Sequence, residues 1–210
     1  MRINYLEFEI NDKKINGIVS NDLYTLNNIC EKINYNYKNS FLISINNLNS
    51  LCQEDLLNMD INSLLNYKLD KKIINKDINY LSISEKIRLL FLKCLSYDYD
   101  VIIFDCILEI LDSDLRTLII KKILDLNKFK GKTIIISSID INIIYEIIDS
   151  LAIFNNKKCI YYGDKYNVPE NFASFIKKIE KKIYENSNIN LGNNDSINEL
   201  IKAIYREVRW

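Results

Sequence analysis

A small group of reactive side chains follows the apolar segment Val101–Phe104, where Asp105, Cys106 and Glu109 lie within five positions. A cysteine attacks as its thiolate, which a neighbouring histidine usually generates. The sequence contains no histidine, so this partner and the commonest general base are both missing. We therefore interpret Cys106 as a small buried apolar residue. One interpretation of Asp105 is a strand-terminal carboxylate that accepts hydrogen bonds from loop amides.

The spacing of the cysteines does not indicate a zinc site or a set of disulfide bonds. No two of them have the C-x-x-C spacing and their number is odd, which argues against a zinc site and against a disulfide framework. We expect reduced thiols in a cytoplasmic protein. The five residues are Cys30, Cys52, Cys94, Cys106 and Cys159.

The balance of charge excludes further classes of function. The 210 residues carry 28 basic and 28 acidic side chains, so we expect neither nucleic-acid binding nor attraction to an anionic membrane. The first residues are too polar for a signal peptide. The strongest apolar run, Val101–Leu111, contains two acidic residues and is too short to insert into a bilayer. Any membrane association is expected to go through a partner.

The spacing of apolar residues predicts the elements that position the reactive group. In the first part of the chain it predicts two strands around a turn at Asn11–Asp12, then a helix and a third strand. Residues 46–80 are rich in Asn, Asp and Leu and predict only short helices. The predicted strands span residues 3–10, 14–20 and 41–45, and the predicted helices span residues 25–33, 54–58 and 61–67.

From Leu81 onward, buried strands alternate with helices, which predicts an α/β fold with a mostly parallel sheet and an antiparallel edge. Ser84, Asp112 or Ser113, and Asp140 are the predicted helix caps, and Gly131 is a predicted helix end. The predicted strands span residues 101–104, 133–137, 151–154 and 158–162. Each of the three predicted helices begins at one of these caps, and the helix that begins at Asp140 is predicted to end at about Ser150. Two amphipathic helices, 170–186 and 195–208, are predicted after Pro169.

Residues 81–164 resemble the second half of the ATP-binding subunit of an ABC transporter, and residues 3–33 resemble it more loosely. Five segments carry the resemblance, because they have the order and the separations of the family's motifs. Leu81–Arg88 is similar to the signature motif, Leu-Ser-Gly-Gly-(Gln or Glu)-(Lys or Arg)-x-Arg, and Val101–Asp105 is similar to the Walker B strand. Glu109–Asp112 is similar to the D-loop, and Lys132–Asp140 is similar to the strand and switch that end in Ser-His-Asp. Leu151–Asp164 is similar to the closing hairpin.

The resemblance implies an ABC-type P-loop ATPase-like domain in residues 1–168 and a helical tail in residues 169–210. Residues 46–80 would form its helical subdomain, which is reduced in length. Gln53 is the only glutamine of that segment, yet Asn46 or Asn47 fits the spacing of the family's glutamine loop better. The position of this loop stays open.

The segment that matches the family's phosphate loop, Gly17–Leu26, departs from it. Such a loop needs glycines whose N–H groups point into one concavity, a lysine for the β- and γ-phosphates, and a hydroxyl for magnesium. Here the lysine is absent and no glycine follows Gly17. Thr25 matches the hydroxyl position, while Asp22 adds a negative charge. We expect normal phosphate binding to be lost.

Other catalytic positions of the family are also altered. Ile83 and Ser84 match the signature glycines, Cys106 matches the catalytic glutamate and Ile139 matches the switch histidine. A neutral thiol cannot polarise an attacking water as a carboxylate does. We expect no catalytic residue, no metal site and no cofactor, with weak Mg·ATP binding as an open alternative. The vestigial nucleotide positions implied by the resemblance are Gly17, Thr25, Ser82, Ser84, Asp105 and Asp112, with Thr25 and Asp105 at the magnesium positions.

The resemblance implies a non-catalytic ATPase-like subunit of a bacterial transport, export or self-protection system. Such a subunit would pair with an active ATP-binding subunit, with itself as a dimer, or with a membrane transporter subunit. Two alternatives stay open. One is a slow ATPase that binds nucleotide through an unrecognised loop, and the other is a free-standing scaffold, adaptor or immunity-like protein.

Overall fold

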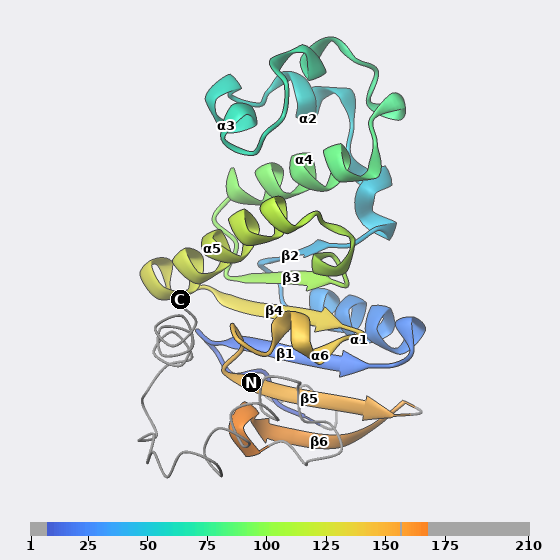
Figure 1. The fold of residues 1–210 in the computed structure, drawn as a ribbon, viewed down its shortest axis with the longest axis vertical. Coiled ribbons are helices and arrows are strands. Elements are labelled where there is room, and N and C mark those ends of the chain that lie inside the picture. Colours follow the sequence, from blue (N-terminus) through green and yellow to red (C-terminus); the bar gives the residue numbers. More distant parts are fainter. Residues whose placement is uncertain (1–7, 156, 168–210) are drawn as a thin grey trace, which may run out of the picture. The chain divides into compact units, whose positions relative to one another are not determined.

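A six-stranded sheet organises the chain in the computed structural model, which describes residues 8–155 and 157–167 (Figure 1). The strand order is β2-β3-β4-β1-β5-β6. The first five strands are parallel, and β6 pairs with β5 in the antiparallel direction. The strands are β1 (Ile15–Ser20), β2 (Ser40–Ile43), β3 (Val101–Asp105), β4 (Thr133–Ser138), β5 (Ser150–Asn155) and β6 (Lys158–Asp164).

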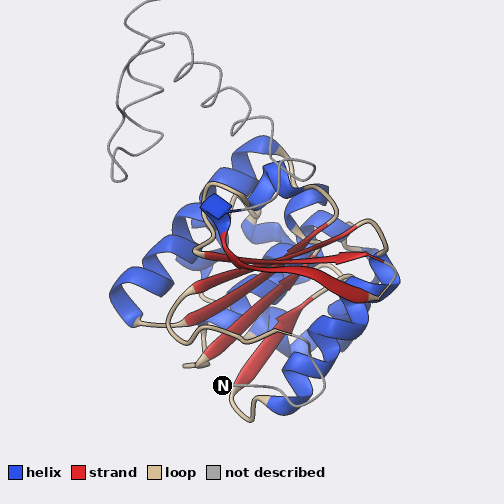
Figure 2. Ribbon diagram, turned by 90° about the horizontal axis from the view of Figure 1, so that it is seen from below, coloured by secondary structure: helices blue, strands red, loops and turns tan. Residues whose placement is uncertain are grey.

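Helices cover both faces of this sheet (Figure 2). On one face α1 (Leu23–Asn36) buries Leu26, Ile29, Cys30 and Ile33 against the strands. The opposite face is covered by α4 (Ile83–Leu95), α5 (Ser113–Lys130) and the short α6 (Ile141–Ile144). The central strands are buried on both faces, which explains their continuous apolar sequence. The α/β fold with an antiparallel edge is confirmed.

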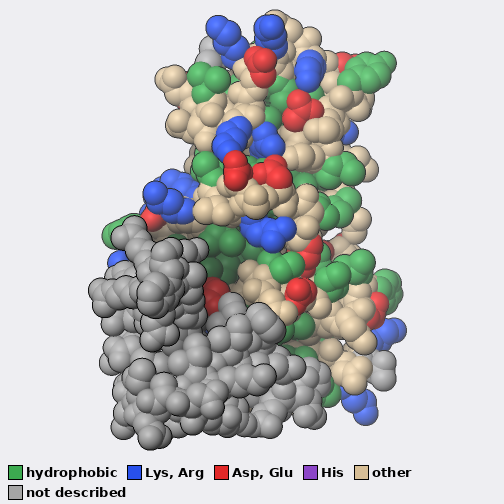
Figure 3. Space-filling view, in the orientation of Figure 1, with side chains coloured by type: hydrophobic (Ala, Val, Ile, Leu, Met, Phe, Trp, Pro, Cys, Tyr) green, Lys and Arg blue, Asp and Glu red, His purple; other side chains and the backbone are tan. Residues whose placement is uncertain are grey.

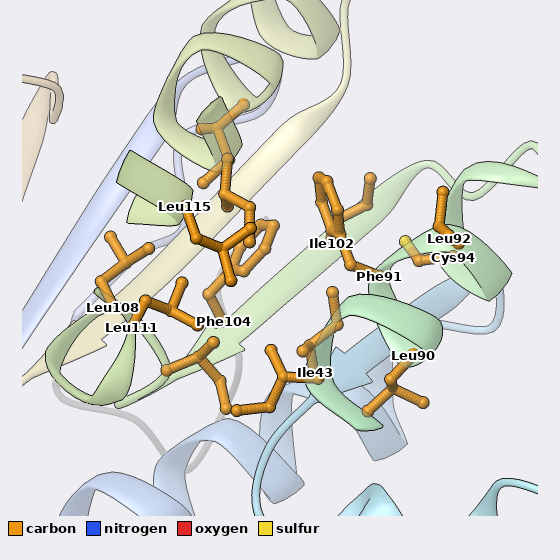
Figure 4. Close-up of a cluster of buried hydrophobic side chains, with 14 of the residues drawn as sticks. Ile43, Leu90, Phe91, Leu92, Cys94, Ile102, Phe104, Leu108, Leu111 and Leu115 are labelled. Atoms are coloured by element: carbon orange, nitrogen blue, oxygen red, sulfur yellow. The ribbon is translucent and has the colours of Figure 1, made fainter. Parts of the chain in front are cut away.

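The larger of the two cores lies on the face of the sheet covered by α4, α5 and α6, and Figure 4 shows the part of it formed by β2, β3, α4 and α5. Phe91 of α4 and Phe104 of β3 have ring centroids 5.9 Å apart. Residues 46–80 add buried side chains to this core. This segment contains α2 (Gln53–Leu57), α3 (Ile61–Asn66) and several 3₁₀ turns. Leu48, Leu56 and Leu64 bury their side chains here, so the short helices are held by packing and not by their length.

Gln53 has a structural role in this segment. Its Nε2 donates to the carbonyl oxygen of Lys76 at 3.1 Å, and its Oε1 accepts from the backbone N–H of Ile78 at 3.1 Å. The side chain therefore closes the 53–78 loop through both of its polar atoms. Asn47, at the other candidate position, donates to the carbonyl oxygen of Leu42.

Two predictions about helix ends were wrong. Ser82, and not Ser84, caps α4. The helix that begins after Asp140 ends at Ile144, although its sequence pattern extends to Ser150. The reason is tertiary, because Asp149 accepts from the backbone N–H of Ile15 at 2.8 Å and thereby ties the chain to the start of β1. Most of the predicted strand 3–10 and both helices after Pro169 lie outside the described residues.

Candidate functional site at the carboxyl edge of the sheet

The residues singled out in the sequence converge on one edge of the sheet. Because β1, β3 and β4 are parallel, their carboxyl ends lie side by side (Figure 1). Ligands of open α/β proteins bind at this edge. Here the edge is formed by the connection after β1, by Asp105 and Cys106 after β3, and by Ile139 after β4.

The connection between β1 and α1 contains only Asn21 and Asp22. The Asp22 carboxylate caps α1, accepting from the N–H groups of Tyr24 at 3.1 Å and Thr25 at 3.2 Å. The Thr25 hydroxyl donates to the same carboxylate, and this hydrogen bond lowers the pKa of Asp22 below its ordinary value. A helix N-terminus attracts an anion through these N–H groups. In this chain an internal carboxylate occupies them.

Gly17 and Thr25, the two ends of the predicted phosphate loop, belong to β1 and to α1. Gly17 is inside β1, paired with Ile136 and Leu151, and is not in the loop. A Cβ atom at this position would lie 2.7 Å from the Cδ1 of Ile148. Gly17 therefore permits close packing of the segment after α6 against β1. Thr25 is buried in the first turn of α1, with its hydroxyl engaged by Asp22.

Asp105 is buried at the end of β3 and both of its oxygens accept hydrogen bonds. The Ser137 hydroxyl donates to Oδ1 at 2.7 Å, and the Asn27 amide donates to Oδ2 at 2.9 Å. These bonds join β3 to β4 and to α1. The donors are side chains, not the loop amides that the sequence suggested. Ser137 could have been found from the parallel register, in which it pairs with Asp105, whereas no sequence signal indicated Asn27.

Cys106 is half-buried and adopts a left-handed backbone conformation with a φ of 52°. Its N–H donates to the Ser137 hydroxyl at 3.0 Å. Burial raises the pKa of its thiol to about 12, so the group is protonated at neutral pH. A protonated thiol is a poor nucleophile and cannot accept a proton from water.

Ile139 follows β4 and presents an exposed apolar side chain at the edge. Its backbone N–H donates to Oε1 of Glu109 at 3.1 Å. This contact ties the connection after β4 to the 3₁₀ turn Leu108–Ile110, which follows β3. Glu109 therefore fixes two connections, a role that its sequence position did not indicate.

The start of α4 is closed by a capping box. The Ser82 hydroxyl accepts from the N–H of Glu85 at 3.2 Å, and the Glu85 carboxylate accepts from the N–H of Ser82 at 2.8 Å. Burial acts to raise the pKa of Glu85, but the hydrogen bonds from Ser82 and Lys76 outweigh it and the pKa is lowered. Ile83 is exposed beside them, and Ser84 accepts from Arg88 at 3.2 Å. As at α1, a side chain of the chain itself occupies N-terminal amides.

Asp112 caps α5 by accepting from the N–H of Leu115 at 2.8 Å. Arg88 approaches the same carboxylate at 3.6 Å and donates to the carbonyl oxygen of Lys68 at 2.8 Å. This arginine joins α4, α5 and the helical segment 46–80. The role of Arg88 was missed in the sequence, where it was only the last residue of a motif.

No protein-family model matches the chain. The chain is 32% identical over 149 residues to the energy-coupling factor transporter ATP-binding protein EcfA2 of Mesomycoplasma hyopneumoniae strain 7448. This match covers 65% of the chain and 48% of that protein. The chain therefore spans about half the length of the curated relatives it matches.

Solved structures share the fold at low sequence identity. CbiO1 from Clostridium perfringens, described as part of the ABC transporter complex cbiONQ, has a TM-score of 0.59 and 17% identity, covering 86% of both chains. The dimeric bacterial ABC transporter cassette MJ0796 has a TM-score of 0.60 and 15% identity, covering 81% of this chain and 90% of that one. The chain has the fold of an ABC-type ATP-binding cassette.

Three of the residues singled out in the sequence lie at the ends of elements in this ABC-type fold. Ser82 begins α4, Asp105 ends β3 and Asp112 begins α5, all at the carboxyl edge. No helix among residues 8–155 and 157–167 is both long and apolar enough to cross a membrane. The same residues contain no group of three or more His, Cys, Asp or Glu side chains that could hold a metal ion.

Proposed function

We propose that the chain is a non-catalytic member of the ABC ATP-binding subunits, working beside an active ATP-binding subunit or a membrane component. The observation that carries this proposal is the Asp22 carboxylate, which fills the N-terminus of α1. A nucleotide phosphate would have to displace this carboxylate and would meet its charge. The segment between Ile15 and Asn27 contains no lysine, and the cation that lies beside Asp22 is Lys157, from the turn between β5 and β6.

The magnesium of a nucleotide also fits poorly with the side chains that are present. The Thr25 hydroxyl is bonded to Asp22, and both oxygens of Asp105 accept from Ser137 and Asn27. A magnesium ion requires carboxylate, hydroxyl or water oxygens in a near-octahedral arrangement. Both candidate ligands are engaged in structural hydrogen bonds, which supports the loss of Mg·ATP binding.

The groups needed for hydrolysis are missing as well. Cys106 and Ile139 stand at the base and switch positions, and the first is a protonated thiol while the second has no polar side-chain atom. A positioned general base contributes about 10²–10⁴-fold to a rate. We therefore expect turnover far below that of an intact cassette.

The names of the similar proteins indicate the type of transport system in which the chain would work. EcfA2 is an energy-coupling factor transporter ATP-binding protein, and cbiO1 is part of an ABC transporter complex. We propose that this chain serves a bacterial transport system at the cytoplasmic side of a membrane partner, with energy-coupled uptake as the favoured kind. Export and self-protection are the other systems considered.

Calorimetric titration of the full chain with Mg·ATP tests the proposal. We expect no saturable heat at millimolar nucleotide, and the same result for Asp105→Ala. Steady-state phosphate release by the wild-type chain that is absent in Asp105→Ala would contradict the non-catalytic assignment.

A second candidate function is weak ATP binding without efficient hydrolysis. The similarity to a protein named as ATP-binding, over 65% of this chain, favours it. Clear micromolar binding of Mg·ATP would select this function, and it would mean that Asp22 moves aside when nucleotide binds.

A further inference from the structure

A hollow of about 760 Å³ lies between the segment 58–67, which contains α3, and the helices α4 and α5. On α4 it is lined by Leu92 and Leu95, near the C-terminal end of that helix. Because α4 begins at the carboxyl edge of the sheet, the hollow lies toward the opposite edge and is separate from the candidate site. Its volume is within the range of about 300–1,000 Å³ that is typical of small-ligand sites.

One part of the lining is apolar. Met59, Tyr67, Leu95 and Leu118 line the hollow, and each is partly buried against the larger core. The Tyr67 ring packs against Phe91, with ring centroids 5.5 Å apart. An apolar or aromatic group that enters the hollow therefore meets side chains that are already held in place, and its burial is favourable without ordering them further.

The α5 side of the lining carries three basic groups. Lys121 and Lys122 lie in the middle of α5, and Lys130 is its last residue. Within the part of the chain that the structure describes, none of these three ammonium groups takes part in an ion pair or a side-chain hydrogen bond. Lys130 acts only at longer range on Asp98, whose ion-pair partner is Lys132. The three lysines are therefore available to an anion.

Two carboxylates line the same hollow. Asp60 is engaged by α3, because it accepts from the N–H of Ser63 at 2.9 Å and from the Ser63 hydroxyl at 3.1 Å. Asp125 acts on Tyr67, whose pKa is raised to about 12 by burial and then by this charge. Three lysines against two aspartates leave one excess positive charge. Figure 3 shows basic and acidic side chains near one another in the upper half of the view, where Figure 1 places α3, α4 and α5.

We propose that this hollow binds a small organic anion, a carboxylate or a phosphate ester on an apolar or aromatic body. The lysines of α5 bind the anionic group through charge-assisted hydrogen bonds, and the apolar part of the lining buries the body. A ligand in this place contacts the segment 58–67 as well as α4 and α5, so its binding stabilises their contact. The inference is independent of the proposed function, because the lining residues do not belong to the carboxyl edge.

The fluorescent probe 1-anilinonaphthalene-8-sulfonate has this chemistry, because it joins one sulfonate to an aromatic body. Titration of the full chain with the probe is expected to give a saturable signal with a dissociation constant below about 1 mM. In Lys121→Glu/Lys122→Glu the affinity should fall at least about tenfold, because two anions replace two cations. Glutamate has a high helix propensity, so α5 should stay intact.

The matched control is Lys71→Glu/Lys72→Glu. These two lysines are adjacent and exposed in the 3₁₀ helix Lys71–Asn75, outside the lining of the hollow. The control changes the net charge of the chain by the same amount, and it should keep the wild-type affinity. Circular dichroism melting of each variant separates a lost site from a lost fold.

Competition for the probe identifies the chemistry of the ligand. Phenyl phosphate and benzoate should each displace the probe, and their relative affinities distinguish a phosphate ester from a carboxylate. Phenol carries the aromatic body alone and inorganic phosphate carries the anion alone. Each of these two should require at least about tenfold more ligand for the same displacement.

Protection from acetylation tests the site in the wild-type chain without any substitution. Acetic anhydride labels accessible lysines, and peptide mass spectrometry follows each of them. Saturating phenyl phosphate should slow the labelling of Lys121 and Lys122 several-fold. It should leave the labelling of Lys71 and Lys72 unchanged.

Four results overturn the inference. The first is a folded wild-type chain that binds neither the probe nor its competitors. The second is probe binding that Lys121→Glu/Lys122→Glu leaves unchanged, and the third is an equal loss of affinity in the control. The fourth is acetylation that phenyl phosphate slows equally at all four lysines, or at none. Each result leaves the non-catalytic assignment standing, because titration with Mg·ATP tests that assignment separately.

Discussion

The interior of the sheet and the connections at its carboxyl edge satisfy their side chains in different ways. β3 and β4 bury isoleucine, valine and phenylalanine on both faces. The connections instead engage their polar groups locally, with Asp22 on α1, Glu85 on α4 and Asp112 on α5. In this chain the strands are therefore held by apolar packing on both faces, whereas the helix termini at the edge are held by local side-chain caps.

The interior should be the region most sensitive to substitution. Phe104 is almost fully buried and contacts Phe91, so Phe104→Ala should lower the free energy of unfolding by about 3–5 kcal/mol. Urea denaturation measures the loss. Tyr35→Ala, at a side chain that is 90% exposed, should change stability by less than about 0.5 kcal/mol. Equal effects of the two substitutions would show that the described packing is wrong.

Gly17 was predicted to lie in the loop at the carboxyl edge, but the structure places it inside β1, in the interior of the sheet. Substitution of Gly17 therefore tests the packing of the interior. Gly17→Ala forces a Cβ atom against Ile148 and should cost about 1–3 kcal/mol of unfolding free energy. Trimming the neighbour in Gly17→Ala/Ile148→Val should recover part of this cost. A double-mutant cycle by urea denaturation measures the coupling. Additive effects would remove the packing explanation.

The cap at α1 should have a smaller effect on stability. Asp22→Ala removes the acceptor for the N–H groups of Tyr24 and Thr25, so the thermal midpoint at pH 7 should fall. Mg·ATP binding should not appear in this variant, because residues 18–26 still contain neither the lysine nor the glycines of a phosphate loop. Asp60→Ala, which removes the cap of α3, is the matched control for the titration. Millimolar or tighter binding by Asp22→Ala alone would show that the carboxylate was the single obstacle.

The same cap gives a pH dependence with a defined sign. The pKa of Asp22 is lowered in the folded chain from its ordinary value of 3.8, so its stabilising contribution is complete above that value. It is lost as the pH falls through the lowered pKa. The difference in thermal midpoint between the wild-type chain and Asp22→Ala should therefore be larger at pH 7 than at pH 2.5. A difference that grows on acidification would reverse the predicted sign.

The smallest effect is expected for the thiol at the edge. Burial raises the pKa of Cys106 to about 12, so iodoacetamide at pH 8 should label it slowly. Cys52 is exposed and should be labelled first, as peptide mass spectrometry of a time course would show. Cys106→Glu should not create ATP turnover, because the phosphate and magnesium positions are still occupied by internal groups. Rapid labelling of Cys106 would argue for a reactive thiolate.

The sequence predicted the elements whose signals are local. The apolar runs of β3 and β4 are long and uninterrupted, and Asp112 and Gly131 mark the two ends of α5, where Gly131 adopts a φ of 61°. The length of the helix after Asp140 was not predictable, because Asp149 and Ile15 are distant in sequence. For the same reason the Asn27–Asp105 bond and the roles of Arg88 and Glu109 appear only in the folded chain.

The sequence by itself determined the α/β order and the resemblance to an ABC-type cassette. It also determined the absence of histidine and the absence of a lysine between Ile15 and Asn27. These properties depend on residue type and on short-range periodicity. The tertiary structure decided what fills the altered positions. It placed Asp22 on the α1 amides and enclosed Asp105 between Ser137 and Asn27. Hydrogen bonds and surfaces that join distant segments are set by strand order and register, which no local pattern encodes.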